Sequence, residues 1–170
     1  MPVKEIMQEE FDQGLGAPGG HLDLGDSRRI KVKRLYSASA TVEGGRQGRV
    51  ASSDGVLDLD LAMPEGLGGP GGPGTNPEQL FAAGYAACFE SAIRLVARQE
   101  KVDVAGASVT ANVDIGQPPD GGFALEAELI GRMPTLSRAE AEKIMEKAHR
   151  ICPYSKATQG NMPVRLRVEE

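Results

Sequence analysis

The chain has no concentration of basic charge. Its 170 residues carry 19 Lys and Arg against 24 Asp and Glu, which gives a formal net charge of -5 at pH 7, and the basic side chains are scattered. A site for nucleic acid or for an anionic membrane needs a clustered positive patch. The sequence therefore predicts neither nucleic acid nor a membrane as a partner.

The start of the chain lacks the marks of a targeting segment. Acidic residues occur early, at Glu5, Glu9, Glu10 and Asp12, and neither a cationic start nor an unbroken apolar run accompanies them. Signal peptides and membrane spans both need a continuous apolar run. We expect a cytoplasmic protein.

Potential metal ligands are few. The chain has two cysteines, Cys88 and Cys152, two histidines, His21 and His149, and no Cys-x-x-Cys pair. His149 and Cys152 are three residues apart and could join Cys88 around a metal, but the fourth ligand would have to be improvised. We expect no metal and no cofactor.

Two enzyme signatures are also missing. No Gly-x-Ser-x-Gly elbow supports a hydrolase. The Gly- and Pro-rich loop 65–74 looks like a phosphate cradle, but it has no Gly-Lys-Ser/Thr ending, and Glu78 in the following helical turn would repel a phosphate. The loop is better interpreted as a wall or connection.

The scarcity of cysteine limits the redox chemistry. Ordinary thiols stay reduced in the cytosol, so Cys88 and Cys152 are not expected to form a permanent structural disulfide. If they meet in the fold, a reversible catalytic or sensing pair is the better interpretation. If they do not meet, each is most simply a small apolar core residue.

A strong helix signal surrounds Cys88. Asn76 can cap the first turn, Pro77 suits the first helical position and Gln79 can reach back to the cap. The pattern predicts a helix from Pro77 to about Lys101. Cys88 is predicted on its inward face, together with the residues that recur at helical spacing: Leu80, Ala83, Gly84, Ala87, Ser91, Leu95 and Val96.

Alternating apolar residues predict strands before this helix and after it. Before it, a strand from Ile30 to Val42 ends at Gly44-Gly45, and segments 49–53 and 56–61 return as an antiparallel meander. After it, segments 102–115 and 123–130 form a hairpin around the turn 118–122.

The last part of the chain predicts one helix and one strand. Ser137-Arg138-Ala139-Glu140 is a capping box, and the helix that it opens reaches Cys152, where Pro153 stops it. A strand over 162–168 follows. The whole pattern predicts an α+β domain over residues 30–170, preceded by an N-terminal extension over residues 1–29 that is a short helix or a flexible arm.

Three separated motifs resemble one known family. They are Thr75 to Phe89, Gly44-Gly45-Arg46-Gln47-Gly48-Arg49, and Cys152-Pro153-Tyr154-Ser155. In order and spacing they resemble the organic hydroperoxide resistance (Ohr) proteins of the Ohr/OsmC family, over the segment from Leu35 to Glu170. The resemblance implies antiparallel sheets packed around central helices in an OsmC-like intertwined homodimer.

The resemblance also implies an activity, a cysteine-based peroxidase that reduces alkyl or fatty-acid hydroperoxides to alcohols. Cys88 would attack the peroxide and become a sulfenic acid, Cys152 would close an intramolecular disulfide, and dihydrolipoamide or a lipoylated protein would reduce it. Arg46 would activate Cys88, because a guanidinium lowers the pKa of a thiol and donates hydrogen bonds to peroxide oxygens. Glu78 would orient Arg46.

Other functions stay open. An OsmC-type enzyme would accept a broader range of peroxides. A thiol redox sensor would be oxidised once and would signal without turnover. A structural dimeric module would keep both cysteines inert.

Helix geometry bears on Glu78. Ten residues separate it from Cys88, so on a continuous helix the two are about 15 Å apart along the axis and face nearly perpendicular directions. Either the helix breaks near Gly84, or a second subunit supplies the glutamate through an antiparallel pair of these helices crossing at Ala83. The small residues there suit a close helix crossing. We therefore expect a homodimer with two active sites at its interface.

Overall fold

The computed structural model describes residues 33–169 of the chain. These residues fall into two compact units, one ending at Asn76 and the other beginning at Pro77. The N-terminal extension and its boundary at residue 29 lie outside the described residues, so both stay predictions.

The first unit contains a three-stranded antiparallel sheet. Its strands are β1 (Ala40–Glu43), β2 (Arg49–Ser52) and β3 (Asp58–Asp60), in the order β1-β2-β3. The predicted meander is confirmed, but its first strand begins at Ala40 and not at Ile30. Residues 33–39 have no regular structure, because a strand needs a ladder partner as well as a suitable sequence.

A tight turn joins β1 to β2. Gly44 and Gly45 have φ angles of 76° and 56°, a region that residues with a side chain rarely adopt. The short 3-10 helix η1 (Gly45–Gln47) follows and contains Arg46. The paired glycine is therefore required by the backbone of the turn that presents Arg46.

The rest of the first unit is a glycine-rich connection. It contains the 3-10 helix η2 (Glu65–Leu67) and returns so that Thr75 forms a parallel bridge with Leu61. Among the residues of this unit that the structure describes, Val50, Leu61 and Met63 are buried.

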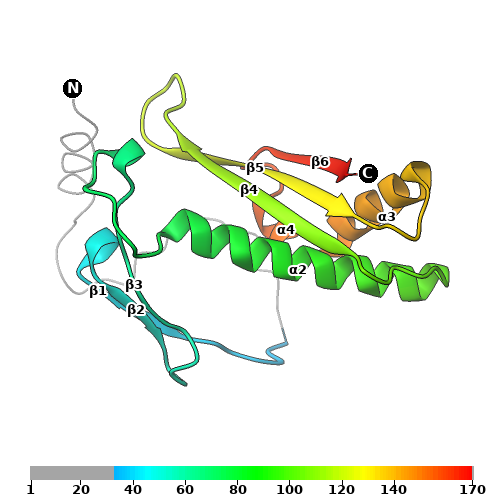
Figure 1. Cartoon of the computed structure of the whole chain (residues 1–170), viewed down its shortest axis with the longest axis horizontal. Helices are drawn as coiled ribbons and strands as arrows, with labels where there is room; N and C mark the ends of the chain where they lie inside the picture. Colours follow the sequence, from blue (N-terminus) through cyan, green and yellow to red (C-terminus); the bar gives the residue numbers. More distant parts are fainter. Residues whose placement is uncertain (1–32, 170) are drawn as a thin grey trace. The chain divides into compact units, whose positions relative to one another are not determined.

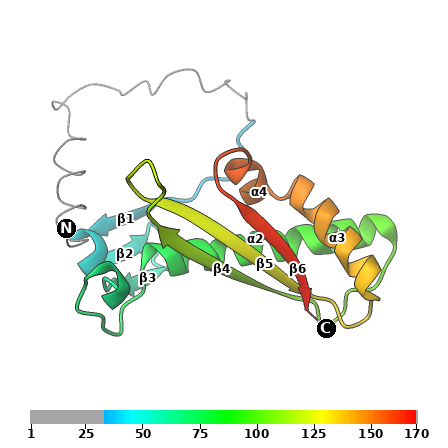
Figure 2. The same ribbon diagram turned by 90° about the horizontal axis from the view of Figure 1, so that it is seen from above.

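The second unit is a three-stranded sheet covered on one face by two helices (Figures 1 and 2). β4 (Ser108–Gly116) and β5 (Ala124–Arg132) form an antiparallel hairpin, and β6 (Val164–Glu169) runs parallel to β5. α2 (Pro77–Glu100) packs under β4, and α3 (Arg138–Ile151) packs beside α2 and β6. The α+β class is confirmed.

The hairpin is confirmed with one shifted boundary. β4 begins at Ser108 and not at Val102, because the segment between them turns. Asp103 closes part of that turn by accepting a hydrogen bond from the backbone N–H of Ala105 at 2.9 Å. A short acidic side chain bonded two residues ahead favours a turn over a strand.

The capping box of α3 is confirmed. The side chain of Ser137 accepts from the N–H of Glu140, and the Glu140 carboxylate accepts from the N–H of Ser137 at 3.0 Å. The buried residues of α3 lie on one stripe of the helix: Ala141, Ile144, Met145 and Ala148.

The prediction that Pro153 stops the helix opened at Ser137 is confirmed, but the helix that follows was not predicted. α3 ends at Ile151, but Pro153 is the first residue of another helix, α4 (Pro153–Thr158). Proline is well suited to a first helical position, since its missing N–H would have no partner there. Cys152 is thus the joint between two helices.

The predicted bounds of α2 are confirmed, but its predicted inward face is largely wrong. The buried residues are Tyr85, Phe89, Ala92, Ile93, Val96 and Ala97. Ala83, Ala87, Ser91 and Leu95 are exposed, and Leu95 is 41% exposed. α2 has apolar residues all around, so periodicity could not select the face that meets the sheet.

α2 is also continuous past Gly84. The predicted alternative in which the helix breaks there is therefore wrong. Glu78 and Cys88 stay on one helix, about 15 Å apart along its axis.

Among the described residues, α2 alone is long and apolar enough to cross a membrane by length and composition. Core helices of soluble proteins pass the same test. Tyr85, Phe89 and Ile93 of α2 are fully buried in the core beneath the sheet, which accounts for the apolar residues on that face of the helix.

Candidate active site

The structure brings the two cysteines together. They are 64 residues apart in sequence, and the Sγ atom of Cys152 donates to the Sγ atom of Cys88 at 3.5 Å. Both are free thiols. Cys152 is fully buried, whereas Cys88 is partly exposed. A peroxide can therefore reach Cys88 more readily than Cys152.

The bend between α3 and α4 places Cys152. Its N–H donates to the carbonyl of Ala148 at 2.8 Å, as the last bond of α3, and its own carbonyl accepts from Lys156 at 3.0 Å, as the first bond of α4. Its backbone is extended, with φ -60° and ψ 125°. This single extended residue changes the chain direction and lets the thiol meet α2.

The described surroundings of Cys88 disfavour its thiolate. Burial raises the pKa of Cys88, a backbone hydrogen bond from Tyr154 lowers it, and the nearby Cys152 thiol raises it further. Burial is the largest effect, so the pKa lies above the ordinary value of a thiol. A reactive thiolate at neutral pH would need a cation beside it.

Three aromatic rings from α2 and α4 pack against one another. Tyr154 packs against Tyr85 and Phe81, with ring centroids 5.7 and 6.1 Å apart, and Phe81 meets Tyr85 edge to face at 5.8 Å. Tyr154 lies on Gly84, where a Cβ atom would come within 3.0 Å of the tyrosine oxygen. Glycine at position 84 is thus what lets this ring settle on α2 one turn before Cys88.

A pocket begins at Phe81 of this cluster. Its volume is about 360 Å³. Its lining is mixed, with apolar side chains that include Phe81, Phe123, Leu125, Ala157 and Met162, and with polar side chains from Thr158 and Asn161. Aromatic and aliphatic walls of this kind suit an apolar ligand.

Arg46 and Glu78, the other two predicted site residues, belong to different units of the chain. Arg46 belongs to the first unit, in η1, and is partly buried. Glu78 lies in the first turn of α2.

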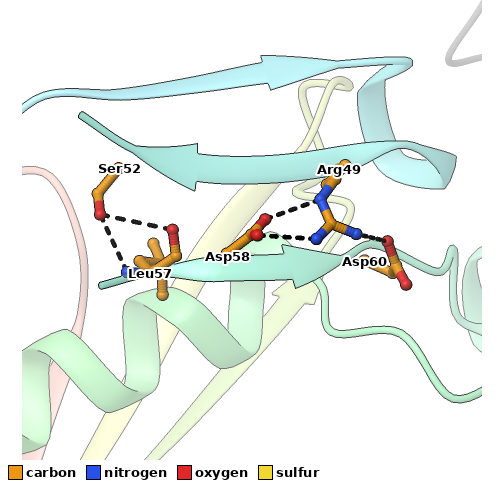
Figure 3. A network of polar contacts seen from close by, with 5 residues as sticks. All are labelled: Arg49, Ser52, Leu57, Asp58 and Asp60. Atoms are coloured by element: carbon orange, nitrogen blue, oxygen red, sulfur yellow. Dashed lines mark hydrogen bonds and ion pairs between the residues drawn. The ribbon is translucent and has the colours of Figure 1, made fainter. Parts of the chain in front are cut away.

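Arg49, the other arginine of the glycine-rich motif, is fully engaged (Figure 3). Its Nε and one terminal nitrogen donate to the two carboxylate oxygens of Asp58 at 2.7 and 2.8 Å, and the other donates to Asp60 at 2.8 Å. These bonds raise the pKa of Arg49 and lower that of Asp58. Arg49 therefore ties β2 to β3, in agreement with its prediction as a strand residue.

His149 is part of the apolar packing. Its ring lies 6.4 Å from that of Phe89, its buried Nδ1 has no hydrogen-bond partner among the described residues, and burial lowers its pKa. Within residues 33–169, no three His, Cys, Asp or Glu side chains are grouped as metal ligands.

Sequence reasoning missed a group of hydroxyl residues beside the thiols. Tyr85 looked like an ordinary apolar residue, and Ser155 and Thr158 carried no signal without α4. Only the Cys152-Pro153-Tyr154-Ser155 motif pointed to this region.

Comparison with known proteins identifies the family. Residues 69–167 match the family described as OsmC-like protein. The chain belongs to the OsmC-like family. It is 53% identical, over 79% of its length and 94% of the relative, to the organic hydroperoxide resistance protein of Xanthomonas axonopodis pv. citri.

Solved structures of the family share the fold. One is the crystal structure of an organic hydroperoxide resistance protein from Legionella pneumophila, with a TM-score of 0.77 and 51% sequence identity. The match covers 81% of this chain and 100% of the Legionella chain. OhrB of Bacillus subtilis has a TM-score of 0.73 and 42% identity, covering 80% of this chain and 100% of its own. The resemblance found in the sequence motifs is thus confirmed.

Proposed function

We propose that this OsmC-like protein is a thiol peroxidase that reduces organic hydroperoxides to alcohols. The observation that carries the proposal is the pair of reduced thiols 3.5 Å apart, one partly exposed and one buried. The relatives named organic hydroperoxide resistance proteins support the substrate class.

The reaction begins at Cys88. Its thiolate attacks the terminal oxygen of the hydroperoxide, the O–O bond breaks, and the alkoxide takes a proton and leaves as an alcohol. Sulfur is oxidised to a sulfenic acid and the peroxide is reduced. The more exposed thiol is the one that meets the substrate.

Cys152 completes the first half of the cycle. Its sulfur displaces the hydroxyl group from Cys88, so that an S–S bond forms, the S–O bond breaks and water leaves with the thiol proton. A disulfide has an S–S distance of about 2.05 Å, so the sulfurs need only a small approach from 3.5 Å. An external dithiol then reduces the disulfide by exchange.

Arg46 is the proposed activator of Cys88. Burial raises the pKa of that thiol, so catalysis at neutral pH requires a cation, and Asp58 and Asp60 already occupy Arg49. Arg46, on a turn built by two glycines, is the remaining arginine of the motif. Glu78 is proposed to orient it, from its own chain or from a partner subunit.

The proposed substrates are alkyl or fatty-acid hydroperoxides, and the proposed reductant is a dihydrolipoyl group, free or on a lipoylated protein. The aromatic and aliphatic side chains that line part of the pocket beside Phe81 offer a hydrocarbon chain contacts that hydrogen peroxide cannot make.

A turnover assay tests the function. We expect steady consumption of many equivalents of cumene hydroperoxide with dihydrolipoamide as reductant, and much slower consumption of hydrogen peroxide. One stoichiometric oxidation followed by arrest would replace the enzyme with a redox sensor. Equal rates for both peroxides would favour a broad OsmC-type peroxidase.

A further inference from the structure

Three buried hydroxyl groups form a cluster beside the thiols that the proposed reaction does not use. The hydroxyl of Tyr85 lies 3.0 Å from the Oγ atom of Ser155 and 3.3 Å from the Oγ1 atom of Thr158. Tyr85 is 0% exposed, Ser155 2% and Thr158 8%.

The cluster joins the two helices that meet at the thiols. Tyr85 precedes Cys88 by three residues on α2, and Ser155 follows Cys152 by three residues on α4. One turn of helix therefore separates each thiol from its end of the cluster. Any shift of α4 against α2 changes the distance between the two sulfurs.

α4 depends on such contacts for its position. It has six residues, far fewer than an isolated helix needs to be stable in water. Thr158 also bonds back to the carbonyls of Tyr154 and Ser155, both at 3.1 Å, so the cluster fastens the whole of α4. Apolar packing alone would tolerate sliding, whereas hydrogen bonds fix distance and angle.

We infer that Tyr85 is a positioning residue for disulfide closure, which holds Cys152 within reach of Cys88 through Ser155 and Thr158. The inference rests on the proposed function in that Cys152 resolves the oxidised Cys88. In this role Tyr85 takes no direct part in the reaction. It acts only by holding α4 in position.

The first experiment follows Tyr85→Phe after oxidation by cumene hydroperoxide. The initial oxidation of Cys88 is expected to stay at the wild-type rate, while disulfide closure slows by about tenfold, since small displacements of reacting groups have large effects on rate. The longer-lived sulfenic acid is then expected to give more sulfinic acid as the peroxide concentration rises, measured by mass spectrometry.

The second experiment does not depend on peroxide. The Cys88–Cys152 disulfide is equilibrated with a glutathione redox buffer, and its equilibrium constant is expected to fall about tenfold in Tyr85→Phe, because the thiols are held together less well. A normal equilibrium and a normal closure rate in Tyr85→Phe would overturn the inference. A tenfold change in this equilibrium without any peroxide oxidation of Cys88 would instead overturn the proposed function alone.

Two further variants separate positioning from general stability. Ser155→Ala removes the same hydrogen bond from the side of α4, so it is expected to repeat both effects even if Tyr85→Phe folds poorly. Tyr36→Phe makes the same chemical change at a tyrosine that is 81% exposed and is the matched control. Lower thermal stability in Tyr85→Phe and Ser155→Ala, with closure and equilibrium both unchanged, would reduce the cluster to an ordinary core contact.

Discussion

The two thiols differ in their surroundings, and this difference suits each of them to the role proposed for it. Cys88 is partly exposed on a long helix, while Cys152 is fully buried at a joint between two helices. An exposed thiol can meet a bulky hydroperoxide, and a buried one is protected from it. In the proposed reaction, the sulfur of Cys88 becomes electrophilic on oxidation, and only then can the Cys152 thiol, 3.5 Å away, attack it.

Replacing Cys152 by serine tests this division. Cys152→Ser is expected to take one oxidation at a rate close to wild type and then to accumulate sulfenic and sulfinic acid, because nothing closes the disulfide. Turnover with dihydrolipoamide is expected to fall by more than about tenfold. Cys88→Ser, the matched control, is expected to take no oxidation. Full turnover by Cys152→Ser would remove its resolving role.

Replacing Arg46 tests the source of activation. Without a neighbouring cation the pKa of Cys88 rises, so in Arg46→Ala the alkylation of Cys88 is expected to require higher pH and peroxide reduction is expected to slow about a hundredfold. Lysine at this position is expected to restore only part of the rate, because it lacks the planar fork. Arg49→Ala is the control. An alkylation profile in Arg46→Ala that matches wild type would contradict the assignment.

Single residues also show what the sequence could reveal about the site. Cys88 and Cys152 were identified through motifs with matching order, and the structure brings their sulfurs together. The hydroxyl of Tyr85 was missed because a tyrosine in an alanine-rich helix looks like an apolar residue, and its hydroxyl finds partners only when α4 folds against it. A sequence pattern predicts the helix or strand that contains a residue, but not the element against which that residue packs.

At the scale of elements, the sequence predicted a helix or a turn well where residues close together in the chain decide it. The capping box at Ser137 and the turn 118–122 gave α3 and the hairpin, since both are decided by neighbouring residues. The inward face of α2 and the start of β4 were mispredicted because packing partners decide them. α4 was missed because one turn of helix has almost no periodicity to detect.

The capping box offers a stability test that is independent of function. Ser137→Ala removes an acceptor for the N–H of Glu140, and it is expected to destabilise the protein by about 1 kcal/mol. Chemical denaturation measures this change. Glu146→Ala, at an exposed position of the same helix, is the control and is expected to be within about 0.5 kcal/mol of wild type. Equal stability of Ser137→Ala and wild type would show that the cap contributes nothing.

At the scale of the whole molecule, the exposed side of α2 is the feature that a single chain leaves unexplained. Ala83, Ala87 and the half-exposed Leu95 form an apolar face opposite the buried one. Small residues allow two helices to approach closely, and a second copy of α2 would cover this face. The continuity of α2 removes the alternative of a broken helix, so the predicted homodimer gains support from the path of α2 itself.

Mixing two inactive variants decides whether Glu78 acts across that dimer. If it does, a heterodimer of Cys88→Ser and Glu78→Ala subunits has one site lacking both residues and one intact site. Random exchange of equal amounts makes half of the dimers heterodimers, so about a quarter of wild-type activity is expected on mixing. Native mass spectrometry verifies the exchange, and Cys88→Ser mixed with the double variant Cys88→Ser/Glu78→Ala, expected to stay inactive, is the control. Complete exchange without recovery of activity would mean that Glu78 serves the cysteine of its own chain. Because α2 keeps the two about 15 Å apart along its axis, Arg46 would then have to bridge that separation itself.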